Sequence, residues 1–173
     1  RVFYDDTPPH TREKAKELFN QTLEMAKAFG LTIVLENPPR HYVRLNLHRS
    51  TTGSFLNSYY KPAFTVELGS SEIVDSSIRT AAKKGLYNVL AYVGMLDIEQ
   101  EPITEVTVHT ETLWREIPLR ATTTGFFVPH AEHGAFINRG KTIAEIRDVF
   151  GKVKDCICAT EEGVVLAYWN DIK

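Results

Sequence analysis

The sequence predicts an α/β domain over residues 1–97, followed by a small all-β domain over residues 98–173. In the first part, segments with apolar residues at three-to-four spacing alternate with short β-branched runs, as is typical of α/β proteins. In the second part, glycines punctuate short apolar stretches, as in a small barrel or sandwich. The charged segment 97–102 separates the two patterns, so we expect the domain boundary near residue 97.

The first helix is expected over residues 11–29. Pro8 and Pro9 precede a threonine N-cap, apolar residues recur at helical spacing, and Gly30 ends the pattern. The β-branched run over residues 31–35 predicts a buried strand, which the Asn-Pro-Pro sequence after it stops. The polar stretch over residues 41–52 is expected to be a loop, and a short helix is expected over residues 54–61.

The segment 62–71 predicts a short buried strand that ends in one acidic residue, Glu67. The strand is bounded by Pro62 and Gly69, and its other side chains are mostly apolar. Open α/β sheets hold their ligand crevice at the carboxyl ends of strands, so Glu67 is a candidate functional carboxylate. The alternative is a structural ion pair with an arginine at a sheet edge, and this stretch by itself does not decide between the two.

The second long helix is expected over residues 75–96. Its apolar stripe comprises Ile78, Ala81, Ala82, Leu86, Val89, Leu90 and Val93. Gly85 is expected to weaken the middle of this helix. Strand-like runs then follow over residues 103–108 and 113–119.

Composition excludes several classes of partner. The hydrophobic fraction is 43%, the charged fraction is 24%, and the net charge is -2, as in an ordinary globular protein without attraction for nucleic acid or anionic membranes. No apolar run approaches the length of a membrane span, and no signal peptide opens the chain. Because Arg1 is no initiator, we expect a piece of a longer protein. Cys156 and Cys158 share one face of a strand-like run and are expected to be packed, reduced thiols in a cytoplasmic protein.

The order of several motifs resembles a known family. TVELG at residues 65–69 is followed by a polar turn and a long helix that ends in NVLAYVGML, at residues 88–96. Downstream come ATTTGFFVPHAEHGAFINRGKTIAEIRDVFG, at residues 121–151, and EEGVVLAYW, at residues 161–169. From Thr11 onwards, the chain resembles the C-terminal portion of the succinylglutamate desuccinylase and aspartoacylase family. The resemblance implies a carboxypeptidase-like α/β/α portion, followed by a barrel-sandwich domain similar to biotinyl and lipoyl carriers.

The resemblance also implies a zinc-dependent hydrolase that cleaves the amide bond of a small N-acyl amino acid or related compound. Glu67 matches the position of the family's general base, and a carboxylate can accept a proton from an attacking water. The family's two zinc-ligand motifs, of the His-Gly-x-Glu and Asp-Leu-His types, are both missing from this sequence. We therefore expect zinc as the cofactor of the full-length protein, with its ligands outside this segment, and an inactive segment when it is isolated.

His10, His41 and His48 are the histidines of the first part that could serve as zinc ligands. His10 and Glu13 have His-x-x-Glu spacing, but they open a helix and are expected to form a solvated first turn. His41 and His48 lie in the polar stretch before Glu67, where a surface position is the commoner outcome. No residue of this chain is therefore assigned as a metal ligand.

Arg49 is the candidate for substrate binding. Substrates of the resembled family are anionic, and a guanidinium binds a carboxylate through two parallel hydrogen bonds. Arg49 lies in a polar, glycine-containing stretch ahead of Glu67, and Arg44 is weighed in the same way. A solvent-facing arginine is the alternative in both cases.

A function of a different class stays open. Carrier domains attach biotin or lipoate to a hairpin lysine, and Lys141 follows Gly140 here, but no Met-Lys-Met pattern is present. The β domain is therefore expected to be a structural cover, with His130 and His133 exposed. The second candidate function is a non-catalytic binding or interaction module, or an inactive fragment of such an enzyme. The expected partner is a small-molecule substrate, and a homo-oligomer is left open.

Overall fold

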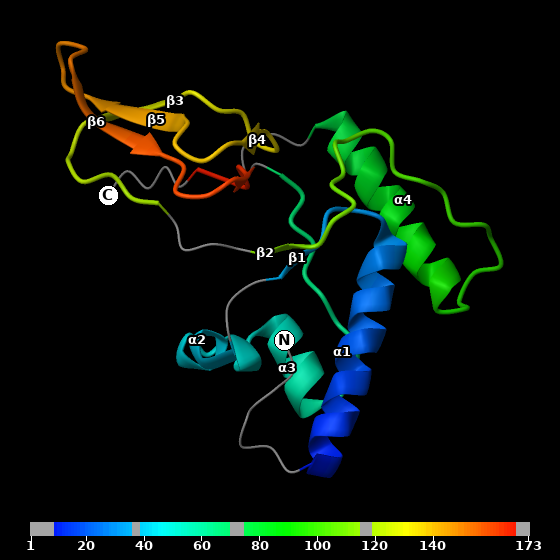
Figure 1. Cartoon of the computed structure of the whole chain (residues 1–173). Coiled ribbons are helices and arrows are strands. Elements are labelled where there is room, and N and C mark those ends of the chain that lie inside the picture. The colour runs from blue at the N-terminus through cyan, green and yellow to red at the C-terminus, as the bar shows by residue number, and fades with distance from the viewer. Residues whose placement is uncertain (1–8, 36–38, 70–74, 115–118, 169–173) are drawn as a thin grey trace. The chain divides into compact units, whose positions relative to one another are not determined.

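The computed structural model describes residues 9–35, 39–69, 75–114 and 119–168. The chain divides into two compact units, Arg1–Arg115 and Glu116–Lys173, each of which is described by itself (Figure 1). The chain contains both helices and strands, and the sequence predicts this mixed class.

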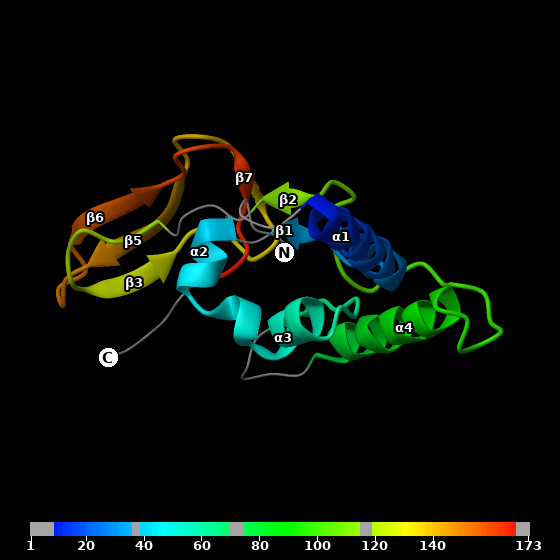
Figure 2. The same cartoon turned by 90° about the horizontal axis from the view of Figure 1, so that it is seen from below.

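Two long helices form the frame of the first unit. Helix α1 spans Pro9–Phe29 and packs against helix α4, which spans Ser76–Tyr92 (Figure 2). Both were predicted from their apolar spacing. Asp75 caps α4, because its carboxylate accepts a hydrogen bond of 2.7 Å from the backbone N–H of Ser77.

Close packing between α1 and α4 depends on Gly85. A Cβ atom at Gly85 would lie 2.2 Å from Cε1 of Phe29, a distance that no real Cβ contact shows. The ring of Phe29 in turn contacts the ring of Phe64 edge to face, with 5.9 Å between their centroids. From the sequence, Gly85 was expected only to weaken helix α4. In the structure it leaves space for the ring of Phe29, a contact between residues that are far apart in the sequence.

Short helices fill the stretch before Glu67. Helix α2 spans Pro39–Arg44, the 3-10 helix η1 spans Leu47–Arg49, and helix α3 spans Thr51–Ser58. The prediction of a loop over residues 41–52 was therefore wrong. The reason lies in packing: Leu56 of α3 joins Ala15 and Leu18 of α1 in a buried cluster, which stabilises helical turns in a polar sequence.

The strand predicted between Pro62 and Gly69 is not a strand in the structure. This segment has no ladder partner within the described ranges, and Glu67 and Leu68 are exposed. It is anchored instead by Phe64 and by a 2.7 Å hydrogen bond between the hydroxyls of Thr52 and Thr65. A strand needs a neighbour for its backbone hydrogen bonds, and alternating apolar residues do not supply one.

The only sheet described in the first unit joins residues far apart in sequence. Strand β1, Val34–Leu35, pairs in parallel with strand β2, Leu113–Trp114. Of the strand-like runs predicted over residues 103–108 and 113–119, only β2 is a strand among the described residues. Residues 115–118 lie outside the described part of the chain.

The segment 98–115 belongs to the first unit and not to the second. The buried side chain of Asn88 exchanges two hydrogen bonds of 2.8 Å with the backbone of Glu101, and β2 pairs with β1. The compact units therefore divide after Arg115, whereas the composition of the sequence placed the boundary near residue 97. A buried amide needs partners, so Asn88 ties the charged segment to α4.

The regular elements described in the second unit are all strands. Strands β3 (Phe126–Pro129), β5 (Thr142–Arg147) and β6 (Val153–Cys158) make an antiparallel sheet in the order β3-β5-β6. Strand β4 (Phe136–Ile137) pairs antiparallel with β7 (Gly163–Val164). The buried apolar residues of the second unit are Ala144, Ile146, Ala159 and Val165. A barrel-sandwich of the biotinyl or lipoyl type remains a prediction for this unit.

Candidate active site

Glu67 lies in a groove of the first unit with a volume of about 280 Å³. Four segments contribute to it: the turn after α1, the end of the segment that contains Glu67, the first turns of α4, and residues 106–107. The lining residues are Leu31, Thr32, Glu67, Leu68, Gly69, Ile78, Ala81, Val106 and Thr107. The exposed carboxylate of Glu67 is therefore placed beside a largely apolar wall.

Gly69 shapes the groove next to Glu67. Its φ of +91° is in the left-handed region, and a Cβ atom there would lie 2.7 Å from Cδ1 of Ile78. The turn thus brings the backbone directly against the first turns of α4. On the other wall, the hydroxyl oxygen of Thr32 accepts a hydrogen bond of 2.9 Å from the backbone N–H of His109.

The geometry suits proton transfer at Glu67. A solvent-accessible carboxylate next to a groove that can admit a small molecule is able to accept a proton from water. Among the nine lining residues, Glu67 is the only ionisable one. Its role as a base, predicted from the sequence, stays a prediction.

Arg49 lies elsewhere on the first unit. It ends the 3-10 helix η1, its side chain is exposed, and it is not among the residues that line the groove. The structure therefore does not bring Arg49 and Glu67 together in one groove lining. Arg44, the other arginine weighed, is also exposed, at the end of α2.

The described residues do not supply a zinc site. Within the described ranges, no three histidine, cysteine, aspartate or glutamate side chains lie close enough together to hold a metal ion. Glu13 is exposed on α1, and the side chains of His10 and His41 lie outside the described part. His48, expected at the surface, is half-buried, and its Nδ1 has no hydrogen-bond partner among the residues that the structure describes.

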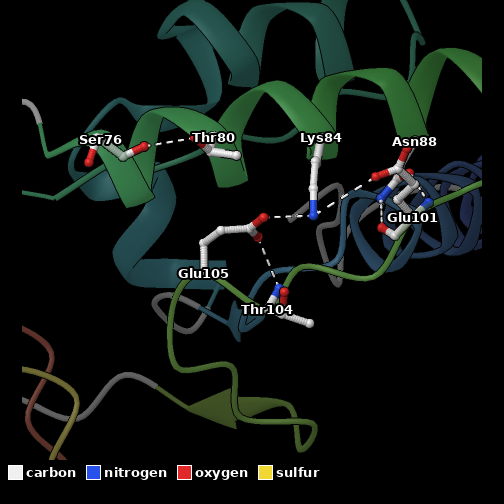
Figure 3. Close-up of polar contacts among 7 residues, drawn as sticks. All are labelled: Ser76, Thr80, Lys84, Asn88, Glu101, Thr104 and Glu105. Atoms are coloured by element: carbon white, nitrogen blue, oxygen red, sulfur yellow. Dashed lines mark hydrogen bonds and ion pairs between the residues drawn. The ribbon is translucent and has the colours of Figure 1, made fainter.

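A polar cluster that the sequence reasoning missed connects α4 to the segment after it (Figure 3). Lys84 Nζ lies 2.6 Å from Glu105 Oε1 and 3.8 Å from Glu101 Oε2. The hydrogen bond between Lys84 and Glu105 raises the pKa of the lysine and lowers the pKa of the glutamate. One signal could have found Asn88: with Ala81 and Gly85 it falls at helical spacing on the buried face of α4.

The second unit contains its own ionic cluster. Arg147 donates two hydrogen bonds, of 2.9 and 2.7 Å, to Oε2 of Glu145, and His130 Nε2 lies 3.2 Å from the same oxygen. The bonds from Arg147, and then the contact with His130, lower the pKa of the Glu145 carboxyl group. His130 is exposed as expected, but it is engaged by Glu145, and the exposed His133 lies against the ring of Tyr168, with 5.1 Å between centroids.

The remaining candidates of the second unit face solvent. Lys141 is exposed directly after Gly140. Cys156 and Cys158 are free thiols, as expected, but they are exposed and not packed, because strand β6 turns that face outwards. No helix within the described ranges is both long and apolar enough to cross a bilayer.

The fold is that of part of the succinylglutamate desuccinylase/aspartoacylase structures, which confirms the resemblance at the level of fold. A succinylglutamate desuccinylase/aspartoacylase from Rhodobacter sphaeroides matches 95% of this chain at 21% identity with a TM-score of 0.69. A succinylglutamate desuccinylase from Silicibacter sp. TM1040 matches 94% of the chain at 19% identity with a TM-score of 0.66. The apo form of the ectoine utilization protein EutE (DoeB) from Ruegeria pomeroyi matches 85% at 22% identity, with a TM-score of 0.61.

This chain spans less than half of each of those structures. The matched part is 46% of the Rhodobacter protein and 45% of the other two. The Ruegeria protein has also been solved with its product bound, and that structure matches 66% of this chain at 24% identity with a TM-score of 0.53. No protein-family model and no curated protein matches the sequence.

Proposed function

We propose that the full-length protein is a zinc-dependent hydrolase that cleaves the amide bond of a small N-acyl amino acid or a related compound. The observation that supports this most is the fold match over 95% of the chain to a succinylglutamate desuccinylase/aspartoacylase. The position of Glu67 in a groove of that fold adds a reactive group. A product-bound structure of a protein with this fold is consistent with a small-molecule substrate.

In the proposed reaction, Glu67 is the general base. Its carboxylate accepts a proton from a water molecule while the water oxygen forms a bond to the amide carbonyl carbon. The carbon–nitrogen bond then breaks, and Glu67 returns the proton to the leaving nitrogen. The products are a carboxylic acid and a free amine, so the proton is borrowed and no other reactant is needed.

Arg49 is proposed to bind the substrate's carboxylate. Its exposed guanidinium is available to a ligand, and two parallel hydrogen bonds to a carboxylate would fix the orientation of the amino-acid part. Since Arg49 is not among the residues that line the groove, the bound amino-acid part would extend beyond that groove.

We propose zinc as the cofactor of the full-length protein and not of this segment alone. Because both zinc-ligand motifs of the resembled family are missing from this sequence, the ion would be held by residues outside this segment. The absence of the zinc-ligand motifs from this sequence is also the reason to keep a second candidate function, a non-catalytic binding or interaction module, or an inactive fragment of such an enzyme.

Two measurements on the freshly purified full-length protein separate the candidates. Elemental analysis is expected to show zinc, and release of free amine from a panel of N-acyl amino acids is expected to require it. Absence of zinc together with no hydrolysis after zinc is added would contradict the hydrolase and favour the binding module. A cytoplasmic location is part of the proposal, and fractionation of cells that express the tagged protein tests it.

A further inference from the structure

One wall of the groove beside Glu67 comes from a segment without regular secondary structure. Residues 101–109 contain neither helix nor strand, and Val106 and Thr107 of this segment line the groove. Because a segment of this kind has no ladder of backbone hydrogen bonds, its path depends on the side chains that contact it. These contacts therefore determine where Val106 and Thr107 lie.

The two ends of the segment are attached to other parts of the first unit. At its start, the buried side chain of Asn88 exchanges two hydrogen bonds of 2.8 Å with the backbone of Glu101. At its end, the hydroxyl oxygen of Thr32 accepts a hydrogen bond of 2.9 Å from the backbone N–H of His109. The stretch between these two attachments contains both wall residues.

An ion pair attaches the middle of the stretch, directly before Val106 (Figure 3). Lys84 Nζ lies 2.6 Å from Glu105 Oε1, and the other carboxylate oxygen of Glu105 accepts a hydrogen bond of 3.0 Å from the backbone N–H of Thr104. The side chains of Lys84 and Glu105 are only 27% and 23% exposed. A fully exposed, isolated ion pair contributes little, whereas a partly shielded pair that belongs to a network holds its geometry better.

From these contacts we propose that Lys84 is a positioning residue of the candidate site. Through Glu105, it holds Val106 and Thr107 in the wall of the groove that Glu67 also lines. The inference rests on the proposed function and gives Lys84 a part in substrate binding, not in proton transfer, because Lys84 does not line the groove. Without the ion pair, the wall would spend a smaller fraction of the time in its binding position, and the apparent affinity falls in proportion to that fraction.

Lys84→Met tests this role in the full-length protein, since methionine removes the charge and keeps most of the side-chain length. With the best substrate of the N-acyl amino acid panel, KM is expected to rise by about three- to tenfold while kcat hardly changes. The control is Lys27→Met, which removes an ion pair of 2.7 Å with Glu24 on α1, away from the groove lining. Equal KM values in the two variants, measured where both are folded, would overturn the proposal, and so would a fall in kcat without a rise in KM.

A double-mutant cycle distinguishes loss of the ion pair from a general loss of stability. Glu105→Gln is expected to raise KM by about as much as Lys84→Met, and the combined variant should show no further rise, because either change removes the same interaction. Effects on KM that multiply in the combined variant would overturn the route through Glu105.

Failure of the proposed function would leave the positioning role testable. If no N-acyl amino acid is hydrolysed, the proposed function is wrong, and the wall is then observed through the backbone amide NMR signals of Val106 and Thr107 in the full-length protein. These signals are expected to shift or broaden in Lys84→Met and to stay unchanged in Lys27→Met. Signals of Val106 and Thr107 that do not move in Lys84→Met would overturn the positioning role.

Discussion

Glu67 and Arg49 lie in different local settings, although the same resemblance pointed to both. Glu67 is an exposed carboxylate beside the apolar wall of a groove, whereas Arg49 is exposed at the end of a 3-10 helix. The first setting allows proton transfer to a bound molecule, and the second allows a charged contact at the surface. Their roles can therefore be tested independently.

Glu67→Gln should abolish proton acceptance while it preserves the shape of the side chain. In the full-length protein, kcat for amide hydrolysis is expected to fall by about two to four orders of magnitude, with zinc content and unfolding midpoint unchanged. Glu111→Gln, at an exposed position that does not line the groove, serves as the control. Turnover of Glu67→Gln close to that of the parent protein would assign Glu67 a structural role.

Arg49→Lys should weaken the binding of anionic substrates selectively. A lysine keeps the charge but cannot form the two parallel hydrogen bonds, so KM for the carboxylate substrate is expected to rise by roughly ten- to a hundredfold. KM for the matching neutral amide should hardly change. Arg44→Lys, also exposed, is the matched control. An equal effect on both substrates would leave Arg49 as a solvated surface residue.

At the scale of elements, the packing of α1 against α4 determines the frame of the groove. Leu31 and Thr32 follow α1, and Ile78 and Ala81 belong to α4, so any change in the approach of the two helices moves both walls. That approach depends on the space that Gly85 leaves for the ring of Phe29.

Gly85→Ala should therefore destabilise the protein, although alanine is the better helix former. The helix propensity of alanine would add about 1 kcal/mol, but a methyl group pressed against the Phe29 ring costs about 1–3 kcal/mol. A net loss is expected in urea unfolding, and combining it with Phe29→Leu should recover part of that loss. Lys83→Ala, at an exposed position of the same helix, is the control. A gain in stability would show that the ring moves aside at no cost.

The sheet of the second unit should lose stability in acid through Glu145. The pKa of this carboxyl group is lowered in the folded state by Arg147 and then by His130. Its charge therefore stabilises the folded protein above the ordinary carboxyl pKa, and this contribution disappears as the pH falls through the lowered value. The parent protein is expected to lose more thermal stability than Glu145→Gln between neutral pH and pH of about 3. Parallel pH profiles of the two proteins would contradict the linkage.

At the scale of the whole molecule, the chain spans less than half of the structures it matches, and this bears directly on metal binding. Calorimetric titration of the 173-residue chain with zinc is expected to show no tight stoichiometric site, because the two zinc-ligand motifs of the resembled family are missing from its sequence. The full-length protein is expected to bind the ion. A sub-micromolar site with one zinc per 173-residue chain would contradict this and direct attention to the His-x-x-Glu spacing of His10 and Glu13.

The helices were the elements most accessible from sequence. Apolar spacing predicted both α1 and α4, because a helix satisfies its own backbone hydrogen bonds and its buried face repeats along the chain. The strand predicted around Phe64 and the loop predicted over residues 41–52 were wrong, since strand pairing and the burial of Leu56 depend on distant neighbours. The structural role of Asn88 was not predicted for the same reason, because its hydrogen-bond partner, the backbone of Glu101, lies 13 residues away on another segment.

The sequence by itself determined the two long helices, the mixed helix and strand class, and the order of motifs that identifies the fold. It also singled out Glu67, because an isolated carboxylate in an apolar run is a local feature. Only the tertiary structure decided that Glu67 lines a groove, that Arg49 is not among the residues lining it, and that residues 98–114 pack with the first unit. The physical reason is that backbone propensity and periodicity depend on residues close together in the sequence. Burial, charge balance and close packing depend on contacts between segments that are far apart in the sequence.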